Sequence, residues 1–336
     1  NIVRTCGVVV LLFSLPLLAF GQGQVLDETL MHEGIERTYK LFIPSTYSPG
    51  SATPLVLNLH GANGNADQQM VSSAMNSVAE VEGFIVAYPN AVDGLWKPAK
   101  YDFSFIDELL DAVGSQYSVD ASRVYSTGLS QGGRVSYRLA ETRPYTFAAI
   151  ASVAGVWAEH HVPSRPFALM HIHGKGDDIT LYNGGTGASG ATRPPVEDIL
   201  HEWLARNGCD ATPSMSELPD IAPDDGSTVS VLSWVDCDTY TSVDGDEIVA
   251  NVVHYRVNGG GHNWPVLEAD RTANLAVTEE TWGSDNLHYF LPLNSDFSAS
   301  ATMWEFFEQH VVAVPEPNGL ALAFVALLGS RLRRRI

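Results

Sequence analysis

The chain has 336 residues, a length that accommodates one large domain or two small ones. Its 19 basic and 39 acidic residues give a formal net charge of −20 at pH 7. A chain this acidic is expected to avoid nucleic acids and anionic membrane surfaces, so the composition argues against either as a partner.

The N-terminal segment 1–21 has the pattern of a secretory signal peptide. A single cation, Arg4, precedes an apolar run over 8–20, and small residues stand at Ala19 and Gly21, where cleavage is expected. The apolar run is too short for a comfortable transmembrane span. We therefore expect an exported protein, secreted or held at the cell surface.

The C-terminal segment 314–336 shows a second targeting pattern. Pro-Glu-Pro at 315–317 is followed by an apolar run over 319–329 and by four arginines. This pattern resembles the PEP-CTERM sorting signal of Gram-negative bacteria, which implies a tail that lies transiently in the membrane and is processed by a sorting protease. An ordinary membrane anchor is the alternative. The two ends hold five of the 19 basic and one of the 39 acidic residues, so the segment between them carries a net charge of −24.

The segment 22–313 is expected to fold as a single domain. Apolar runs of strand length alternate with stretches of helical periodicity, which predicts the α/β class: a mainly parallel sheet with helices on both faces. Strands are predicted at 37–43, 54–60, 83–88, 123–126, 147–153, 167–172 and 253–257. Helices are predicted at 66–82, 105–117, 134–141, 196–207 and 299–309.

Two further stretches of this segment have weak periodicity. The stretch 217–225 is rich in Asp and Glu and is expected to be a solvated turn. The stretch 266–296 contains several aromatic residues and is expected to run over one end of the sheet as a surface excursion. Whether it forms a lid is left open.

The most informative stretch is 124–133. Its Gly128-Leu129-Ser130-Gln131-Gly132 follows a predicted strand and precedes a predicted helix, which is the context of the G-x-S-x-G nucleophile elbow. Such a turn forces the serine into a strained backbone conformation, and side chains at the two glycines would clash with the neighbouring strand and helix. The motif alone also occurs in flexible Gly/Ser-rich loops, so the interpretation depends on partners elsewhere in the chain.

Those partners follow in the order serine, acid, histidine, each after a predicted strand. The strand at 167–172 leads into a glycine-broken loop with Asp177 and Asp178, either of which is placed to orient an imidazole. The strand at 253–257 leads into three glycines and His262, and this loop can bring the ring to the serine. A simple Asp turn and a surface histidine are the alternatives.

Two backbone amides are candidates to bind the oxyanion of a tetrahedral intermediate. One is the N–H of Gln131, directly after the serine. The other lies in the loop His-Gly-Ala-Asn-Gly at 60–64, where Ala62 is the expected donor. His60 and His173 are expected to be structural.

Cys209 and Cys237 are the two cysteines that remain after the signal peptide. An even pair in an exported protein predicts a disulfide, here closing a loop of roughly 28 residues. Two free buried thiols are the alternative. There is no C-x-x-C spacing, and the adjacent His160 and His161 have no further partner at ligand spacing, so neither a metal nor a cofactor is expected.

The whole of 22–313 resembles the secreted α/β-hydrolase-fold esterases that include bacterial feruloyl esterases and polyhydroxybutyrate depolymerase-like proteins. The blocks that carry the resemblance are Leu-His-Gly at 59–61, Gly-Leu-Ser-Gln-Gly-Gly at 128–133, His-Gly-Lys-Gly-Asp at 173–177, Asn-Gly-Cys at 207–209, Cys237, Gly-Gly-Gly-His-Asn-Trp-Pro at 259–265 and Trp-Glu-Phe-Phe at 304–307. The resemblance implies that Asp177 rather than Asp178 is the acid, that His262 is the base and that the two late cysteines are bridged. Relatives often have proline after the acid, where this chain has Asp178.

The resemblance also implies an activity, that of a serine carboxylesterase. Ser130 would attack an ester carbonyl, His262 would act as general base and Asp177 would fix the tautomer of the imidazole. Feruloyl or acetyl esters on polysaccharide are the expected substrates, and polyhydroxybutyrate or its oligomers are the runner-up. A non-catalytic surface protein that binds matrix glycan on the same scaffold is the alternative of another class.

Aromatic residues near these loops are candidates to line the substrate pocket. Trp264 stands two residues after the histidine and Tyr182 follows the acid loop, with plain packing as the alternative for both. Trp96 and Trp282 are weaker candidates. The sequence does not predict the oligomeric state.

Overall fold

The computed structural model describes residues 23–97, 102–157, 162–270 and 293–313, together with a few isolated positions between 271 and 292. The predicted signal peptide, the predicted sorting tail and the histidines at 160 and 161 lie outside the described residues, as does most of the predicted surface excursion. Within the described part of the chain, no helix is long and apolar enough to span a bilayer.

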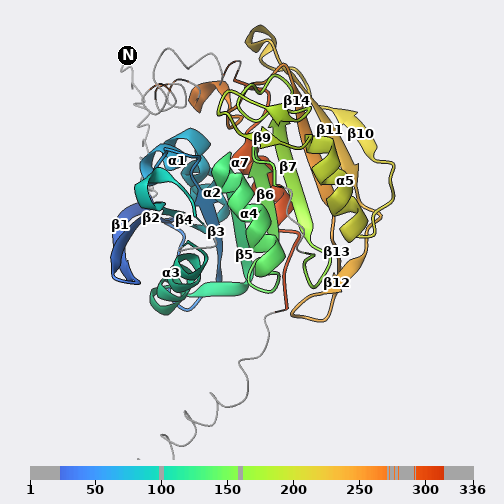
Figure 1. The fold of residues 1–336 in the computed structure, drawn as a ribbon. Helices are drawn as coiled ribbons and strands as arrows, with labels where there is room; N and C mark the ends of the chain where they lie inside the picture. The colour runs from blue at the N-terminus through green and yellow to red at the C-terminus, as the bar shows by residue number, and fades with distance from the viewer. Residues whose placement is uncertain are drawn as a thin grey trace, which may run out of the picture.

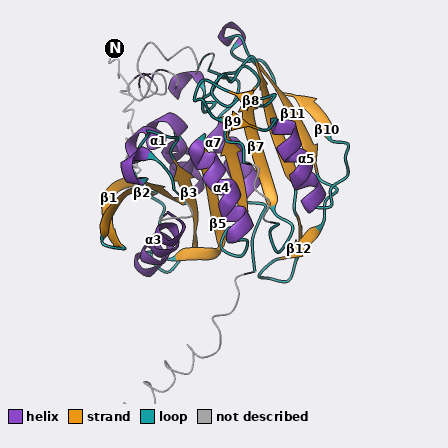
Figure 2. Ribbon diagram, viewed as in Figure 1, coloured by secondary structure: helices purple, strands orange, loops and turns teal. Residues whose placement is uncertain are grey.

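One ten-stranded sheet forms the centre of the molecule, in the order β1-β2-β4-β3-β5-β6-β7-β14-β11-β10 (Figures 1 and 2). From β4 to β14 all neighbours are parallel, and antiparallel strands complete the sheet at each edge. The strands are β1 Gln24–His32, β2 Ile35–Ile43, β3 Thr53–Leu59, β4 Ile85–Pro89, β5 Val119–Leu129, β6 Ala149–Val153, β7 Ala168–Gly174, β10 Ser214–Glu217, β11 Thr228–Trp234 and β14 Val252–Asn258. The predicted single-domain α/β fold with a mainly parallel sheet is confirmed.

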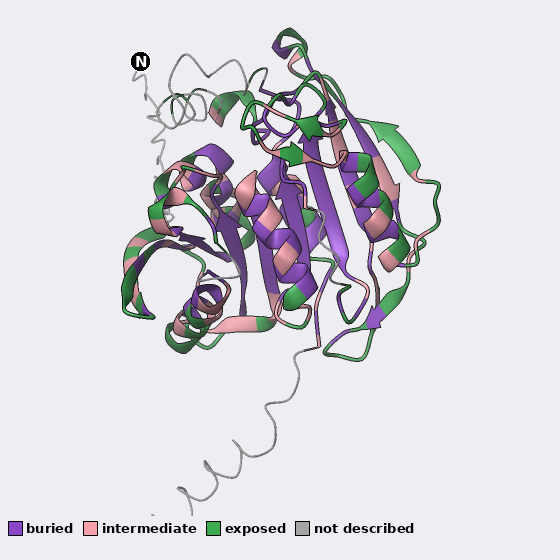
Figure 3. Ribbon diagram, in the orientation of Figure 1, coloured by how far each residue is buried: buried purple, intermediate pink, exposed green. Residues whose placement is uncertain are grey.

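Helices cover both faces of this sheet, so its central strands are buried on both sides (Figure 3). Along β3, Leu57 packs on the face covered by α3, α4 and α5, whereas Val56 packs on the face covered by α1, α2 and α7. This double burial explains why the central strands have nearly continuous apolar sequences. The helices are α1 Ala66–Ser73, α2 Met75–Glu82, α3 Phe103–Gln116, α4 Gln131–Thr142, α5 Val196–Arg206 and α7 Ala299–Phe307.

The single helix predicted over 66–82 was wrong, because the chain turns sharply between α1 and α2. Ala74 has a left-handed φ of +50° and its N–H donates to the carbonyl of Val71. The buried Asn58 side chain of β3 donates to the hydroxyl of Ser73 and to the sulfur of Met75, one on each side of the break. The turn therefore lets both helices satisfy one buried amide, a long-range contact that periodicity cannot show.

The outer strands were not predicted. Strand β1 pairs along its whole length with β2, and β10 and β11 extend the other edge beyond β14. The acidic stretch ends in a short 3-10 turn at Pro223–Asp225, in which Asp224 is exposed as predicted. Asp225 is instead buried, because its carboxylate accepts from the backbone N–H groups of Ser227 and Ser295, each at 2.8 Å.

The predicted disulfide between Cys209 and Cys237 is present. It joins the loop after α5 to the loop after β11, and the N–H of Asp238 donates to the carbonyl of Asn207 beside it. The disulfide therefore connects a helix on one face of the sheet to its antiparallel edge.

Candidate active site

Ser130 stands at the turn between β5 and α4, and its backbone is strained. Its φ of +54° and ψ of −110° lie outside the regions that residues with a side chain favour. Its N–H donates to the carbonyl of Val153 at 2.7 Å, and its carbonyl accepts from Arg134 of the first helical turn. The local geometry is thus the sharp strand-to-helix turn that the motif predicts.

The two flanking glycines have no room for side chains. A Cβ atom on Gly128 would lie 2.5 Å from the carbonyl oxygen of Leu59, and one on Gly132 would lie 2.1 Å from the same oxygen. Strand β3 therefore packs directly against the turn. This close approach brings the loop after β3 beside the serine, and a Cβ atom on Gly61 would be 3.5 Å from the Cβ of Ser130.

Asp177 and His262 meet at the ends of neighbouring strands, β7 and β14. His262 donates from Nδ1 to Oδ2 of Asp177 at 2.7 Å, and both side chains are buried. The other carboxylate oxygen accepts from the backbone N–H groups of Ile179 and Thr180, at 2.9 and 2.7 Å. Asp178 is exposed, so the structure pairs the imidazole with Asp177.

Glycines allow these two loops to pack closely. The N–H of Gly176 donates to the carbonyl of Gly260 at 2.9 Å, and a Cβ atom on Gly174 would lie 2.2 Å from that same carbonyl oxygen. Because β5, β7 and β14 all run parallel in this part of the sheet, Ser130, Asp177 and the loop of His262 emerge at the same edge.

The Asp177 carboxylate has a second imidazole partner that the sequence did not reveal. His173 lies at the end of β7, and its Nε2 is 3.1 Å from Oδ2 of Asp177 and 2.8 Å from the carbonyl oxygen of Thr180. Burial by itself would raise the pKa of the Asp177 carboxyl, but its interactions with the rings of His262 and His173, which donate hydrogen bonds to it, hold it well below its ordinary range. The carboxylate is therefore ionised at neutral pH.

The protons of this cluster can be assigned from the acceptors. Because a carbonyl oxygen only accepts, Nε2 of His173 carries a hydrogen and its Nδ1 accepts from His171 Nε2 at 3.1 Å. His171 Nδ1 in turn accepts from the hydroxyl of Tyr137 at 2.8 Å. Burial lowers the pKa of His171 well below its ordinary value, which agrees with a neutral ring. The expectation that His173 is structural thus omits its direct contact with the acid.

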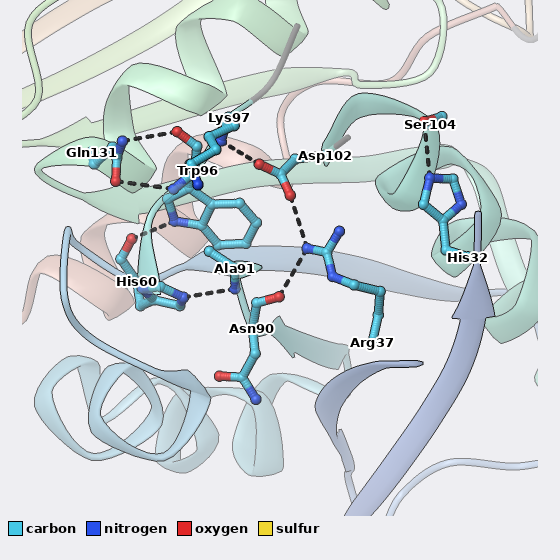
Figure 4. A network of polar contacts seen from close by, with 10 residues as sticks. All are labelled: His32, Arg37, His60, Asn90, Ala91, Trp96, Lys97, Asp102, Ser104 and Gln131. Atoms are coloured by element: carbon cyan, nitrogen blue, oxygen red, sulfur yellow. Dashed lines mark hydrogen bonds and ion pairs between the residues drawn. The ribbon is translucent and has the colours of Figure 1, made fainter. Parts of the chain in front are cut away.

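The candidate oxyanion loop is held by His60 (Figure 4). Its Nδ1 donates to the carbonyl of Gly61 at 2.6 Å, and its Nε2 accepts from the N–H of Ala91 at 3.0 Å. Burial lowers the pKa of His60 to about 4, so the ring is neutral at pH 7. His60 therefore fixes the loop that carries Ala62.

Trp96 closes the other side of this loop, and Gln131 binds it at two points (Figure 4). The indole N–H donates to the carbonyl of His60 at 2.8 Å. The side-chain amide of Gln131 accepts from the N–H of Trp96 at 3.1 Å and donates to its carbonyl at 2.9 Å. Gln131 thus positions Trp96 through its side chain. Its backbone N–H takes no part in these two bonds and stands at the start of α4.

A buried ion pair supports the segment after Trp96. Asp102 accepts from Arg37 of β2 at 2.8 Å and from the backbone N–H of Lys97 (Figure 4). The Arg37 guanidinium also lies 3.8 Å from the ring centre of Phe105. Neither charged residue carries a recognisable motif, so sequence reasoning missed both.

Trp264 and Tyr182 have the contacts of packing residues, which is the alternative that the sequence left open. Trp264 is 1% exposed and its indole N–H donates to Ser300 at 3.2 Å. Tyr182 is 3% exposed and its hydroxyl lies 3.0 Å from Nε2 of His254. Trp282 lies outside the described residues. No group of three or more potential metal ligands occurs within the part of the chain that the structure describes.

Several known proteins are similar to this chain in sequence. Residues 37–190 match the family model described as "Esterase PHB depolymerase". The bifunctional acetylxylan esterase/xylanase XynS20E of Neocallimastix patriciarum is 25% identical over 246 residues, which cover 71% of this chain and 33% of the relative. Feruloyl esterase C of Emericella nidulans is 28% identical over 184 residues, which cover 52% of this chain and 64% of the relative. The chain thus spans less than two thirds of the length of either relative.

Among solved structures, the acetyl xylan esterase from Aspergillus awamori is similar in fold. The superposition has a TM-score of 0.52 and 18% sequence identity, and it covers 74% of this chain and 97% of that structure. At this identity the likeness concerns the fold alone.

Proposed function

We propose that this chain is a serine carboxylesterase with Ser130 as nucleophile, His262 as general base and Asp177 as orienting acid; its α/β fold and its similarity to esterases support this. The observation that carries the proposal is the 2.7 Å hydrogen bond from His262 Nδ1 to Asp177. It fixes the tautomer in which Nδ1 carries the proton and Nε2 is the basic nitrogen.

The reaction then follows in two steps. Nε2 of His262 takes the hydroxyl proton of Ser130 as the oxygen attacks the ester carbonyl, and the imidazolium gives this proton to the departing alcohol. An acyl-enzyme on Ser130 remains. Water attacks it with His262 again as base, which releases the acid and restores the serine.

The backbone N–H groups of Gln131 and Ala62 are the proposed donors to the oxyanion. Two features support this role: Gln131 opens α4, so its N–H is free of any partner within the helix, and the loop of Ala62 lies against Ser130. The network of His60 and Trp96 holds that loop before substrate arrives, as an oxyanion site requires.

The proposed substrates are feruloyl or acetyl esters on polysaccharide, and the names of the acetylxylan and feruloyl esterase relatives support this choice. Polyhydroxybutyrate or its oligomers are the second candidate, which the matching family model favours. A comparison of kcat/KM for methyl ferulate, acetylated xylan and a hydroxybutyrate trimer separates the two.

The proposal includes export of the protein to the outside of a Gram-negative cell, with the tail 314–336 read by a sorting protease. The disulfide supports export, because such bonds persist in oxidising compartments.

The activity is tested with p-nitrophenyl acetate and the purified protein. We expect hydrolysis by the wild type and a fall in kcat of about 10⁴-fold or more in Ser130→Ala, with unchanged thermal unfolding. Ser115→Ala, which removes an exposed hydroxyl from α3, is the matched control and should retain full activity. A folded wild type that hydrolyses no ester would instead support the non-catalytic, glycan-binding alternative.

A further inference from the structure

A cavity of about 210 Å³ is lined largely by the helix that begins directly after Ser130, and its lining is cationic and aromatic. It is lined by Trp96, Gln131, Arg134, Val135, Arg138 and Trp157. Four of these residues belong to the first eight residues of α4, which begins directly after Ser130. The cavity therefore begins one residue from the proposed reaction centre, on the side of Trp96.

Arg134 differs from three other shielded arginines of the described chain, although not from all of them. Arg37, Arg143 and Arg206 each pair with a carboxylate, at 2.8, 2.7 and 3.1 Å. Within the described residues Arg134 has no carboxylate or hydrogen-bond partner for its guanidinium, although this side chain is only partly exposed. Burial, and secondly the charge of Arg193, lowers the pKa of Arg134 to about 10, so it remains charged at pH 7.

Arg138 adds a second cation to the same wall. Its guanidinium carbon lies 4.9 Å from the ring centre of Trp157 and 4.9 Å from that of Phe103. These ring contacts hold the guanidinium, and the Glu141 carboxylate three residues further along α4 acts on it electrostatically. Two cations thus share a small cavity in a protein of net charge −20, where a positive patch opposes the overall field.

The position of Arg134 suits a ligand that also reaches Ser130. Residues four apart on a helix lie on one face, with Cβ atoms roughly 5–6 Å apart, and helical side chains lean toward the N-terminus. Ser130 is the N-terminal cap of α4, so by this general rule we expect the guanidinium of Arg134 to lean toward the serine end of the helix. An anion bound there would be only a few bonds away from a carbonyl at Ser130.

We infer that the substrate is an ester with a free carboxylate, which binds Arg134 and Arg138 while Trp96 and Trp157 pack against its apolar part. This inference rests on the proposed esterase function and names its substrate class. Partial burial of an unpaired guanidinium costs desolvation free energy. A carboxylate ligand can offset this free energy through charge-assisted, bidentate hydrogen bonds. Two sources share this chemistry: a uronic acid residue near the ester on a glycan, and the free end of a hydroxy-acid oligomer.

The first test compares two esters of similar length, mono-4-nitrophenyl succinate, which has a carboxylate, and 4-nitrophenyl butyrate, which is neutral. We expect the ratio of their kcat/KM values, succinate over butyrate, to fall about 10-fold to 100-fold in Arg134→Met and less in Arg134→Lys. Arg123→Gln removes the same charge earlier in β5, where Arg123 pairs with Asp120, and should leave the ratio unchanged. An equal ratio in wild type and Arg134→Met would overturn the inference.

A second test does not depend on hydrolysis, so that failure of the cavity and failure of the esterase proposal can be told apart. Ser130→Ala is titrated with monomethyl succinate and with dimethyl succinate, following the intrinsic tryptophan fluorescence, to which Trp96 and Trp157 of the cavity contribute. Tighter binding of the monoanion, lost when Arg134→Met is added, would support the site even if the wild type hydrolysed no ester. Equal binding of the two compounds, or binding of neither, would contradict it.

Natural substrates identify the source of the carboxylate. One pair is an acetylated xylan oligosaccharide with and without a glucuronic acid residue, and the other is the hydroxybutyrate dimer and its methyl ester. A kcat/KM advantage for the acidic member of one pair, removed by Arg134→Met, assigns that source. No advantage in either pair would count against the inference.

Discussion

His173 provides the sharpest test of how the acid is held. The change His173→Phe removes one donor from the Asp177 carboxylate, removes the partner of the Thr180 carbonyl and leaves the Nε2–H of His171 without an acceptor. A buried donor without a partner costs about 1–3 kcal/mol, and so we expect a loss of roughly 2–4 kcal/mol in the free energy of unfolding.

The effect on catalysis should be smaller than that of losing the acid itself. Asp177 keeps its bonds from His262, Ile179 and Thr180, so we expect kcat to fall about tenfold, which corresponds to about 1.4 kcal/mol. Loss of the His173 donor concentrates charge on the carboxylate and stabilises the protonated ring of His262. The acid limb of the pH profile of kcat/KM should therefore move to higher pH.

The assay is hydrolysis of p-nitrophenyl acetate across pH 5–9, together with urea unfolding. His173→Gln restores an N–H donor and should recover part of the activity and part of the shift. A destabilised His173→Phe variant with an unshifted acid limb and unchanged kcat would refute the reasoning and leave His173 a purely structural residue.

Three further predictions concern the framework of the site. Gly132→Ala should lower the free energy of unfolding by about 3 kcal/mol or prevent folding, because its Cβ would lie 2.1 Å from a carbonyl oxygen of β3. Gly114→Ala, in the open part of α3, should raise the free energy of unfolding by about 0.5–1 kcal/mol. Thermal unfolding of both variants checks these two expectations. Replacing Cys209 and Cys237 by serine should lower the free energy of unfolding in urea by about 3–4 kcal/mol, given the separation of 28 residues, and an unchanged value would show that the bond does not form. The pKa of Asp177 is lower in the folded than in the unfolded protein, so its ionised form contributes stability. This contribution is complete above the unfolded pKa of about 4 and is lost as the pH falls toward the folded pKa. The difference in free energy of unfolding between wild type and Asp177→Asn should therefore shrink from pH 7 to pH 3 in urea titrations.

The sequence predicts those parts of the site that are written in short contiguous runs. The turn at Ser130, the choice of a loop after β7 for the acid and the glycine-rich loop of His262 follow from local rules about strands, turns and glycine, and the structure has each of these loops at one edge of the sheet. The central strands are predictable for the same reason, since double burial leaves continuous apolar runs.

What the sequence cannot show are contacts between distant segments. The break at Ala74 follows from a buried amide on β3, and the ion pair of Arg37 with Asp102 joins residues 65 positions apart. The second donor to Asp177 looks like an ordinary strand histidine until the side chains are placed. Such contacts leave no periodicity and no spacing, so they require the folded structure.

Reaction with an organophosphate tests the central claim most directly. A serine activated by His262 should be phosphorylated by p-nitrophenyl diethyl phosphate, with one adduct per chain, located at Ser130 by mass spectrometry of peptides. The adduct should be absent in Ser130→Ala and should form at least 100-fold more slowly in His262→Ala. A single adduct on another serine, or full esterase activity in a protein that forms no adduct at Ser130, would contradict the account.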